Sequence, residues 1–277
     1  MKKILDNKKA VAGIIVIFIM LIIAIFAHQI APHDPYEQNI MLRYQEPEGL
    51  GGEYILGTDN LGRDLFSRII VGTRISLLVG LIAVGLSLVI GVILGSLAGY
   101  VGGIVDEVIM RFMDVILAFP SILLAIFIVA TLGPGFVNAM FAIAIVRIPS
   151  MARVTRSQVL SLKEEEFVEA AMAVGVSNFK ILFKHILMNG FAPMMVIATL
   201  GMGTAIVTEA SLSFLGLGAQ PPVISWGRML AMGREAMRSA PHVTTYSGIA
   251  IVIAVLGFNL LGDGMRDVFD PKMGQHR

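Results

Sequence analysis

The chain has 277 residues, of which 56% are hydrophobic and 15% charged, with a formal net charge of +1. A soluble domain carries about a quarter charged residues, so this composition indicates a protein that has lipid as part of its solvent. The near-zero charge argues against a nucleic-acid-binding protein, which needs a concentrated basic face. The absence of cysteine excludes disulfides and thiolate metal sites, and the five histidines lack the spacing of metal ligands.

The first predicted element is a membrane span. Lysines precede an apolar run over residues 10–30, which is long enough to cross a bilayer at about 1.5 Å per residue. The run is too long for the core of a signal peptide, and no small-residue cleavage site follows it before Pro32. We therefore expect residues 1–31 to form a cytoplasmic N-terminus and an uncleaved first span.

Residues 32–74 differ from the run before them. Prolines and glycines break any long helix here, and acidic residues outnumber basic ones, which favours an external loop. Near the end of the loop, Thr58 or Asp59 is predicted to cap a turn, and an amphipathic helix at the membrane interface is expected to follow.

Residues 75–265 are predicted to form a core of five further spans. The second span covers about residues 75–99, and its regularly spaced glycines allow neighbouring helices to pack closely. The third covers about residues 108–132, with a kink at Pro120. The fourth covers about residues 136–150, with Arg147 near its inner end.

Charged residues lie at the membrane boundary that precedes the third span. An unpaired charge in hydrocarbon is costly, so a structural Asp–Arg pair is expected here. The alternative is a pair of carboxylates in acid–base catalysis, which would need a pocket. The residues are Asp106, Glu107, Arg111 and Asp114.

The segment 164–189, within a predicted cytoplasmic loop over residues 151–190, is expected to form two short helices. Gly175 stands where the first helix would close in the left-handed conformation, and Ser177 is placed to cap the second. A compact unit of this kind suits a groove on a soluble partner, whereas the alternative is an ordinary connector. The predicted apolar faces comprise Phe167, Val168, Ala171 and Val174, then Phe179, Leu182, Phe183 and Ile186.

The fifth span is predicted over about residues 191–217 and the sixth over about residues 245–261. Glu209 lies inside the fifth span, where a carboxylate is either a pathway residue or a partner in a helix–helix hydrogen bond. The segment between these spans is rich in helix breakers and is expected to be external, with Trp226 at the interface. Residues 266–277 are expected to form a cytoplasmic tail. Lys and Arg are more frequent in the loops assigned to the cytoplasm, which supports this orientation.

Four motifs account for much of residues 56–271. They are LGTDNLGRDLFSR with GTRISL at 56–77, the pattern Glu169-Ala170-Ala171, Gly175 and Ile186-Leu187, SFLGLGAQPPVISWG at 213–227, and NLLGDGMRDVFDP at 259–271. Together they resemble the permease subunits of ABC importers of the dipeptide, oligopeptide and nickel branch. The Glu-Ala-Ala pattern is similar to the EAA loop of that family, which often has proline where this chain has Met188.

The resemblance implies an all-α integral membrane protein with the type I ABC importer permease fold, six transmembrane helices and a cytoplasmic EAA coupling loop. It implies alternating access in the cell (inner) membrane of a bacterium or archaeon. The implied partners are a second homologous permease, two ATP-binding subunits and an external solute-binding protein. The residues implied in coupling to the ATPase are Glu169, Ala170, Ala171, Gly175, Phe179, Ile186 and Leu187.

This chain has no P-loop sequence, so ATP and Mg²⁺ are expected in the partner subunits, and neither a cofactor, a metal site nor a catalytic residue is expected here. The resemblance implies di- or oligopeptides as substrates, and nickel or a metal chelate is the alternative. An ion-coupled secondary transporter is the rival class, but it would need a coupling-ion site, and internal repeats would point to it. An intramembrane enzyme would need several titratable groups at one depth.

Overall fold

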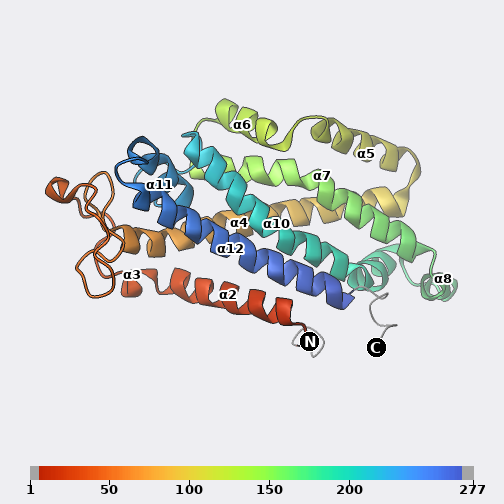
Figure 1. The fold of residues 1–277 in the computed structure, drawn as a ribbon. Helices are drawn as coiled ribbons and strands as arrows, with labels where there is room; N and C mark the ends of the chain where they lie inside the picture. The colour runs from red at the N-terminus through yellow and green to blue at the C-terminus, as the bar shows by residue number, and fades with distance from the viewer. Residues whose placement is uncertain (1–5, 270–277) are drawn as a thin grey trace.

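The computed structural model describes residues 6–269, which are helical apart from loops and one isolated bridge between Thr58 and Asp64 (Figure 1). The long helices lie roughly side by side, with the loop over residues 31–64 at one end and the short helix α8 at the other. The elements are α2 (Lys8–Ile25), α3 (Ala27–Ile30), η1 (Ile40–Leu42), α4 (Leu65–Val101), α5 (Gly103–Leu117), α6 (Ser121–Leu132), α7 (Phe136–Lys163), α8 (Glu166–Ala173), α9 (Asn178–Lys180), η2 (Ile181–Leu187), α10 (Phe191–Phe214), α11 (Trp226–Gly233), η3 (Arg234–Ala236) and α12 (Pro241–Phe269).

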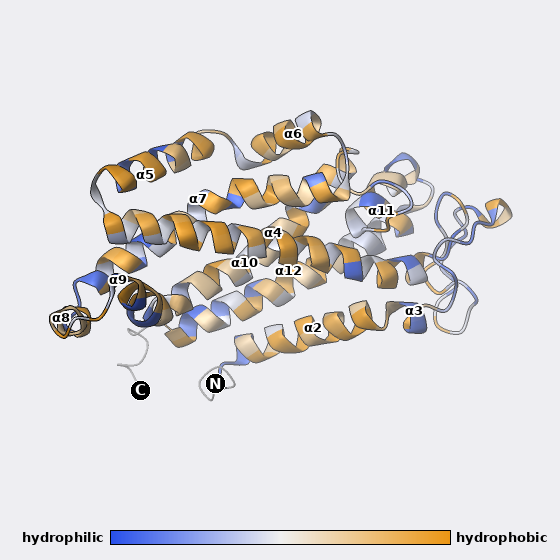
Figure 2. Ribbon diagram, turned by 180° about the vertical axis from the view of Figure 1, so that it is seen from behind, coloured by the Kyte–Doolittle hydropathy of each residue, from blue (hydrophilic) through white to orange (hydrophobic). Residues whose placement is uncertain are grey.

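Five of the described helices, α2, α4, α7, α10 and α12, are long and apolar enough to cross a membrane. A sixth span results if the bent pair of α5 and α6 counts as one. Figure 2 shows that hydrophobic residues predominate along these helices, whereas the loop over residues 31–64 is mostly hydrophilic. This arrangement confirms the all-α membrane fold and accommodates the predicted six spans.

Helix α4 packs extensively against α7, and glycine makes this close approach feasible. An added Cβ at Gly91 would lie 2.6 Å from the Met151 side chain, and one at Gly95 would lie 2.3 Å from the Ala152 carbonyl oxygen. Helix α2 meets α12 in the same way, because a Cβ at Gly13 would lie 2.4 Å from the backbone nitrogen of Leu261. The predicted role of the α4 glycines in helix packing is thus confirmed.

The structure corrects the predicted interfacial helix before the second span. Residues 65–74 are the first part of α4 itself, and Asp64 caps this helix. Asp59 caps the preceding turn, as predicted, because its carboxylate accepts hydrogen bonds from the backbone N–H groups of Leu61 at 2.8 Å and Arg63 at 3.1 Å. The Asp64 carboxylate accepts a hydrogen bond of 2.9 Å from the backbone N–H of Ser67. An apolar pattern does not distinguish a helix that bends at the interface from one that continues across it.

The predicted kink at Pro120 is also wrong, because the third span is broken into two helices. Helix α5 ends at Leu117, α6 begins at Ser121, and the two axes differ by 89°. Phe119 precedes proline and is disfavoured in the helical conformation, so the chain leaves the helix before the proline itself. Both helices lie on the outer side of α7 in Figure 1.

The fourth span is longer than predicted. Pro149 lies inside α7, which continues through Lys163 and does not end near Ser150. The first part of the predicted 151–190 loop is therefore the last part of a long helix.

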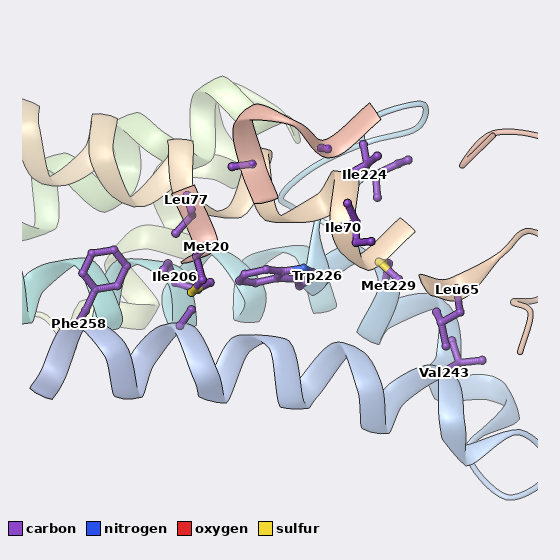
Figure 3. Close-up of a cluster of buried hydrophobic side chains, with 14 of the residues drawn as sticks. Met20, Leu65, Ile70, Leu77, Ile206, Ile224, Trp226, Met229, Val243 and Phe258 are labelled. Carbon is purple, nitrogen blue, oxygen red and sulfur yellow. The ribbon is translucent and has the colours of Figure 1, made fainter. Parts of the chain in front are cut away.

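A buried apolar cluster at the loop end contains Trp226, which is only 1% exposed (Figure 3). The cluster combines residues from α2, α4, α10, α11 and α12, among them Met20, Leu77, Ile206 and Phe258. The indole N–H donates a hydrogen bond of 3.0 Å to the backbone oxygen of Ile69. The prediction of an interfacial anchor was therefore wrong, because tertiary contacts enclose this side chain completely.

Candidate functional site

Residues 164–189 form a short-helix unit at the end of the molecule opposite the 31–64 loop (Figure 1). Helix α8 closes at Gly175, whose φ is +80°, as the sequence predicted. The N–H of Val176 donates to the oxygen of Ala171 at 3.1 Å, and the N–H of Gly175 donates to that of Met172 at 3.0 Å. These two bonds form a Schellman motif, which turns the chain sharply into the second helix.

The second helix of the unit is irregular. Ser177 occupies the N-cap position of α9 but makes no side-chain capping bond, and the turns of η2 are π-helical. The Asn178 carboxamide accepts a hydrogen bond of 3.0 Å from the Tyr100 hydroxyl, and the Lys163 ammonium donates one of 2.9 Å to the Tyr100 carbonyl. The Tyr100–Asn178 bond attaches the unit to the end of α4, and the Lys163–Tyr100 bond joins the ends of α7 and α4 beside it.

A small apolar core holds the two halves of the unit together. Val168 and Ala171 of α8 pack with Ile181 and Ile186 of η2 and with Val159 of α7, and all of them are buried. Leu187 is partly buried beside them. The residues Ala171, Ile186 and Leu187, which the resemblance implied in coupling, therefore contribute to the internal packing of the unit.

Val176 and Leu182 also pack against this core, whereas six other large apolar side chains of the unit face outward and form what we call the exposed apolar surface. Val174 is 79% exposed, Phe179 71% and Met188 72%, and the Phe179 and Phe183 rings lie 4.4 Å apart. Glu169, Ala170 and Gly175 are also exposed. The predicted apolar faces are thus divided between a core and an outer surface. The surface comprises Phe167, Met172, Val174, Phe179, Phe183 and Met188.

The boundary charges of α5 form ion pairs with α7. Asp106 accepts two hydrogen bonds of 2.5 Å from the Arg156 guanidinium, and Asp114 accepts one of 2.6 Å from Arg153. The expected Asp–Arg pairing is therefore present, with arginines of another helix as partners. These pairs hold the outer helix α5 against α7 near the short-helix unit.

Glu209 is buried near the loop end of α10. Its carboxylate accepts a hydrogen bond of 2.6 Å from the Ser213 hydroxyl and one of 3.1 Å from that of Ser225, whose hydroxyl also caps α11. The sequence left two roles open for Glu209, a pathway residue or a partner in a helix–helix hydrogen bond. The geometry supports the second role. The carboxylate fastens α10 to the start of α11.

Sequence reasoning did not predict two groups of polar contacts. One is a buried network at the loop end, where Asp59 pairs with Arg63 at 2.8 Å and with Arg68 at 3.2 Å. The other is Arg147, whose guanidinium donates a hydrogen bond of 2.6 Å to the Thr204 hydroxyl of α10. The signal in both cases is a charged side chain in a segment that is otherwise apolar or tightly turned.

A bundle of membrane-length helices that carries a unit with its own apolar core and an exposed apolar surface defines an integral membrane protein. The family model described as "Binding-protein-dependent transport system inner membrane component" matches residues 91–275. A second model, "N-terminal TM domain of oligopeptide transport permease C", matches residues 1–47. The chain belongs to the family of inner membrane components of binding-protein-dependent transport systems. Membership implies a solute-binding protein and an ATPase as partners.

Matches to curated relatives cover nearly the whole chain. A protein of Alkalihalophilus pseudofirmus named dipeptide transport system permease protein DppC is 50% identical over 98% of this chain and 88% of its own length. A glutathione transport system permease protein, GsiD, of Pectobacterium atrosepticum is 45% identical over 98% of this chain and 90% of its own length. A di/tripeptide transport system permease protein of Pseudomonas aeruginosa is 44% identical over 96% of this chain and 89% of its own length.

A solved structure supports the fold. An inward-facing form of the MetNI methionine ABC transporter matches 74% of this chain and 98% of its own chain, with a TM-score of 0.60 and 18% identity. At that identity the match shows the fold alone, and it confirms the type I importer permease architecture.

Proposed function

We propose that this chain is a non-catalytic permease subunit that forms half of the translocation pathway of an ATP-driven importer of di- or oligopeptides. A second, homologous permease forms the other half, two ATP-binding subunits hydrolyse ATP with Mg²⁺, and an external solute-binding protein delivers the substrate. Family membership and the names of the curated relatives support this assignment.

The observation that carries the coupling role is the exposed apolar surface on a unit with its own buried core. Exposed apolar side chains that gather in this way are typical of a binding site for another chain. Because Ile181 and Ile186 pack against α8, the two short helices move as one body. Closure of the ATP-binding subunits would therefore be transmitted through the unit into α7 and α10, the long helices that precede and follow it in the chain.

The proposed orientation places the short-helix unit in the cytoplasm and residues 32–74 outside. In Figure 1 the first residues of α2 and the last residues of α12 lie towards the end that carries α8. Lys8 and Lys9 at the start of α2 agree with a cytoplasmic position under the positive-inside tendency. The C-terminal motif extends beyond Phe269, and that part lies outside the described residues.

The proposed substrate rests on the relatives. Those named for dipeptides, di/tripeptides and glutathione are each at least 44% identical over nearly the whole chain, which favours peptides over nickel or a metal chelate. Each of these named solutes carries a carboxylate group.

The test is the variant Gly175→Val. A β-branched residue at a φ of +80° costs on the order of 1 kcal/mol or more, which would distort the turn between α8 and α9 without changing a membrane helix. We expect normal insertion, lower recovery of the ATP-binding subunits on purification, and at least about tenfold lower peptide uptake, a change equivalent to about 1.4 kcal/mol.

The matched control is Gly216→Val, because Gly216 has the same φ of +80° but follows α10 at the opposite end. This control should keep the ATP-binding subunits attached. Full recovery of those subunits together with full uptake in Gly175→Val would show that the short-helix unit is a passive connector and would reject the coupling role.

A further inference from the structure

Arg147 lies in the middle of a membrane-spanning helix. It is about 17 Å along α7 from Phe136 and about 24 Å from Lys163, whereas the hydrocarbon core of a bilayer is about 30 Å thick. An arginine at such a depth is costly unless it meets a counter-charge or a water-filled cavity. Its surroundings therefore indicate what it binds.

The guanidinium lies over the backbone of α10. A Cβ added to Gly201 would come within 2.0 Å of an Arg147 terminal nitrogen, so only glycine leaves room for this arrangement. Thr204, one helical turn further on, accepts the 2.6 Å hydrogen bond. Helix α10 is thus shaped to hold the guanidinium at its surface.

Most of the hydrogen-bonding capacity of Arg147 is unused. A guanidinium has five N–H donors in a planar fork, and the Nε of Arg147 has no partner in the structure. None of the ion pairs formed by residues 6–269 includes Arg147. The site therefore has a positive charge and free donors, which match a carboxylate.

The face of α10 that begins at Gly201 continues with hydroxyl groups towards the loop end. Thr204, Thr208 and Ser211 follow at spacings that place them on one side of the helix. Each of these hydroxyls donates to a carbonyl oxygen of α10 itself, and the oxygens of Thr208 and Ser211 can still accept hydrogen bonds from a solute or water.

We propose that Arg147 and Thr204 form a carboxylate-binding site on the water-filled pathway, where the transported solute makes contact at mid-membrane. This inference rests on the proposed transport of peptides and adds the residue that meets their negative charge. The fork of Arg147 supplies two parallel N–H donors to the carboxylate, and the Thr204 hydroxyl holds the guanidinium in place.

Cysteine labelling tests the site without measuring transport, since the chain contains no native cysteine. Thr204→Cys is expressed with the rest of the transporter, and membrane vesicles open to either side are treated with an anionic and a cationic methanethiosulfonate of similar size. We expect labelling with the anionic reagent to be about tenfold faster, because the positive charge of Arg147 concentrates anions at the thiol. Any effect of Arg147 on the thiolate itself is common to both reagents and cancels in the ratio.

Two further variants identify the source of that preference. In Thr204→Cys with Arg147→Gln, the ratio should fall to within about twofold of unity, whereas Arg147→Lys should retain most of it because the charge remains. Phe18→Cys, at an exposed apolar position on α2, is the control and should label slowly with both reagents. An unreactive Thr204→Cys, or a ratio near unity with Arg147 present, would overturn the proposal. The second result would mean that an acidic group of a partner subunit neutralises the arginine.

Uptake then tests the ligand. Arg147→Gln should lower uptake of a dipeptide such as alanylalanine at least about tenfold while the ATP-binding subunits still co-purify, since the variant removes the charge and the paired donors that bind the peptide carboxylate. Unchanged uptake would reject the carboxylate role. Absence of peptide uptake by the unmodified transporter would reject the proposed substrate, and the labelling ratio would still decide the anion site.

Discussion

The two ends of the molecule are stabilised by different interactions. At the loop end, buried polar side chains bind one another. Asp59 is 4% exposed and pairs with Arg63 and with Arg68, which itself donates a 2.7 Å hydrogen bond to the carbonyl of Pro35. His242 of α12 contacts the carbonyl of Thr58 at 3.2 Å. These bonds join the loop to α4 and α12 within one chain.

At the opposite end, the short-helix unit has a core of few residues and an exposed apolar surface. Its polar bonds to the rest of the chain include that of Asn178 with Tyr100. The comparison shows that buried ion pairs within the chain fix the loop end, although the loop also exposes Ile40, Met41 and Leu50. The short-helix end is held by a small apolar core instead, and it presents apolar side chains that burial against another protein would stabilise.

Asp59→Leu should produce the largest loss of stability. The substitution leaves Arg63 and Arg68 in their buried positions without a counter-charge, which costs about 3–5 kcal/mol. Thermal unfolding in detergent can be followed by fluorescence, because Trp226 is the single tryptophan and is fully buried. Glu53→Gln, an exposed acidic position of the same loop, should unfold like the unmodified protein. Equal unfolding temperatures for the two variants would show that the network contributes nothing.

Trp226→Phe should have an intermediate effect of about 1–2 kcal/mol, from lost packing and from the lost hydrogen bond to the Ile69 carbonyl. Because this variant removes the fluorescent reporter, its stability is measured by the temperature at which the monodisperse peak is lost in size-exclusion chromatography. Phe112→Leu on the exposed face of α5 is the control and should shift that temperature little. A larger temperature shift for Phe112→Leu than for Trp226→Phe would show that the Trp226 cluster is not a main source of stability.

The sequence predicted the elements that depend on local patterns. Apolar runs of membrane length identify the spans, and Gly175 marks a left-handed turn because few other residues tolerate its φ. The spaced glycines of α4 predicted its close packing with α7. Each of these features depends on residues close together in the chain.

The features that the sequence did not predict depend on contacts between distant residues. Trp226 and Ile69 are 157 positions apart, and only the folded structure shows that the indole is enclosed. The Arg147–Thr204 contact joins two separate helices in the same way. The periodicity of the short helices likewise identified their apolar residues but could not distinguish Ile181, which is buried, from Phe179, which is exposed.

Phe179→Ser should have the smallest effect on the stability of the chain and a large effect on assembly. Because the ring is 71% exposed, its removal should change the free energy of unfolding by no more than about 0.5 kcal/mol. Recovery of the ATP-binding subunits should nevertheless fall, since the ring belongs to the exposed apolar surface.

The matched variant Ile181→Ala removes a fully buried side chain two positions further on, and it should cost about 2–5 kcal/mol through the cavity that it leaves in the core of the unit. Both quantities are measured on one preparation, with Trp226 fluorescence for unfolding and co-purification for assembly. If Phe179→Ser lowers stability as much as Ile181→Ala, the ring is part of the fold and the surface is not a docking site. If Phe179→Ser changes neither quantity, the ring contributes neither to the fold nor to assembly, and a docking role for this side chain is rejected. Loss of assembly without loss of stability would establish the difference between the two ends. Only a side chain that is buried against another chain can affect assembly and leave the stability of this chain unchanged.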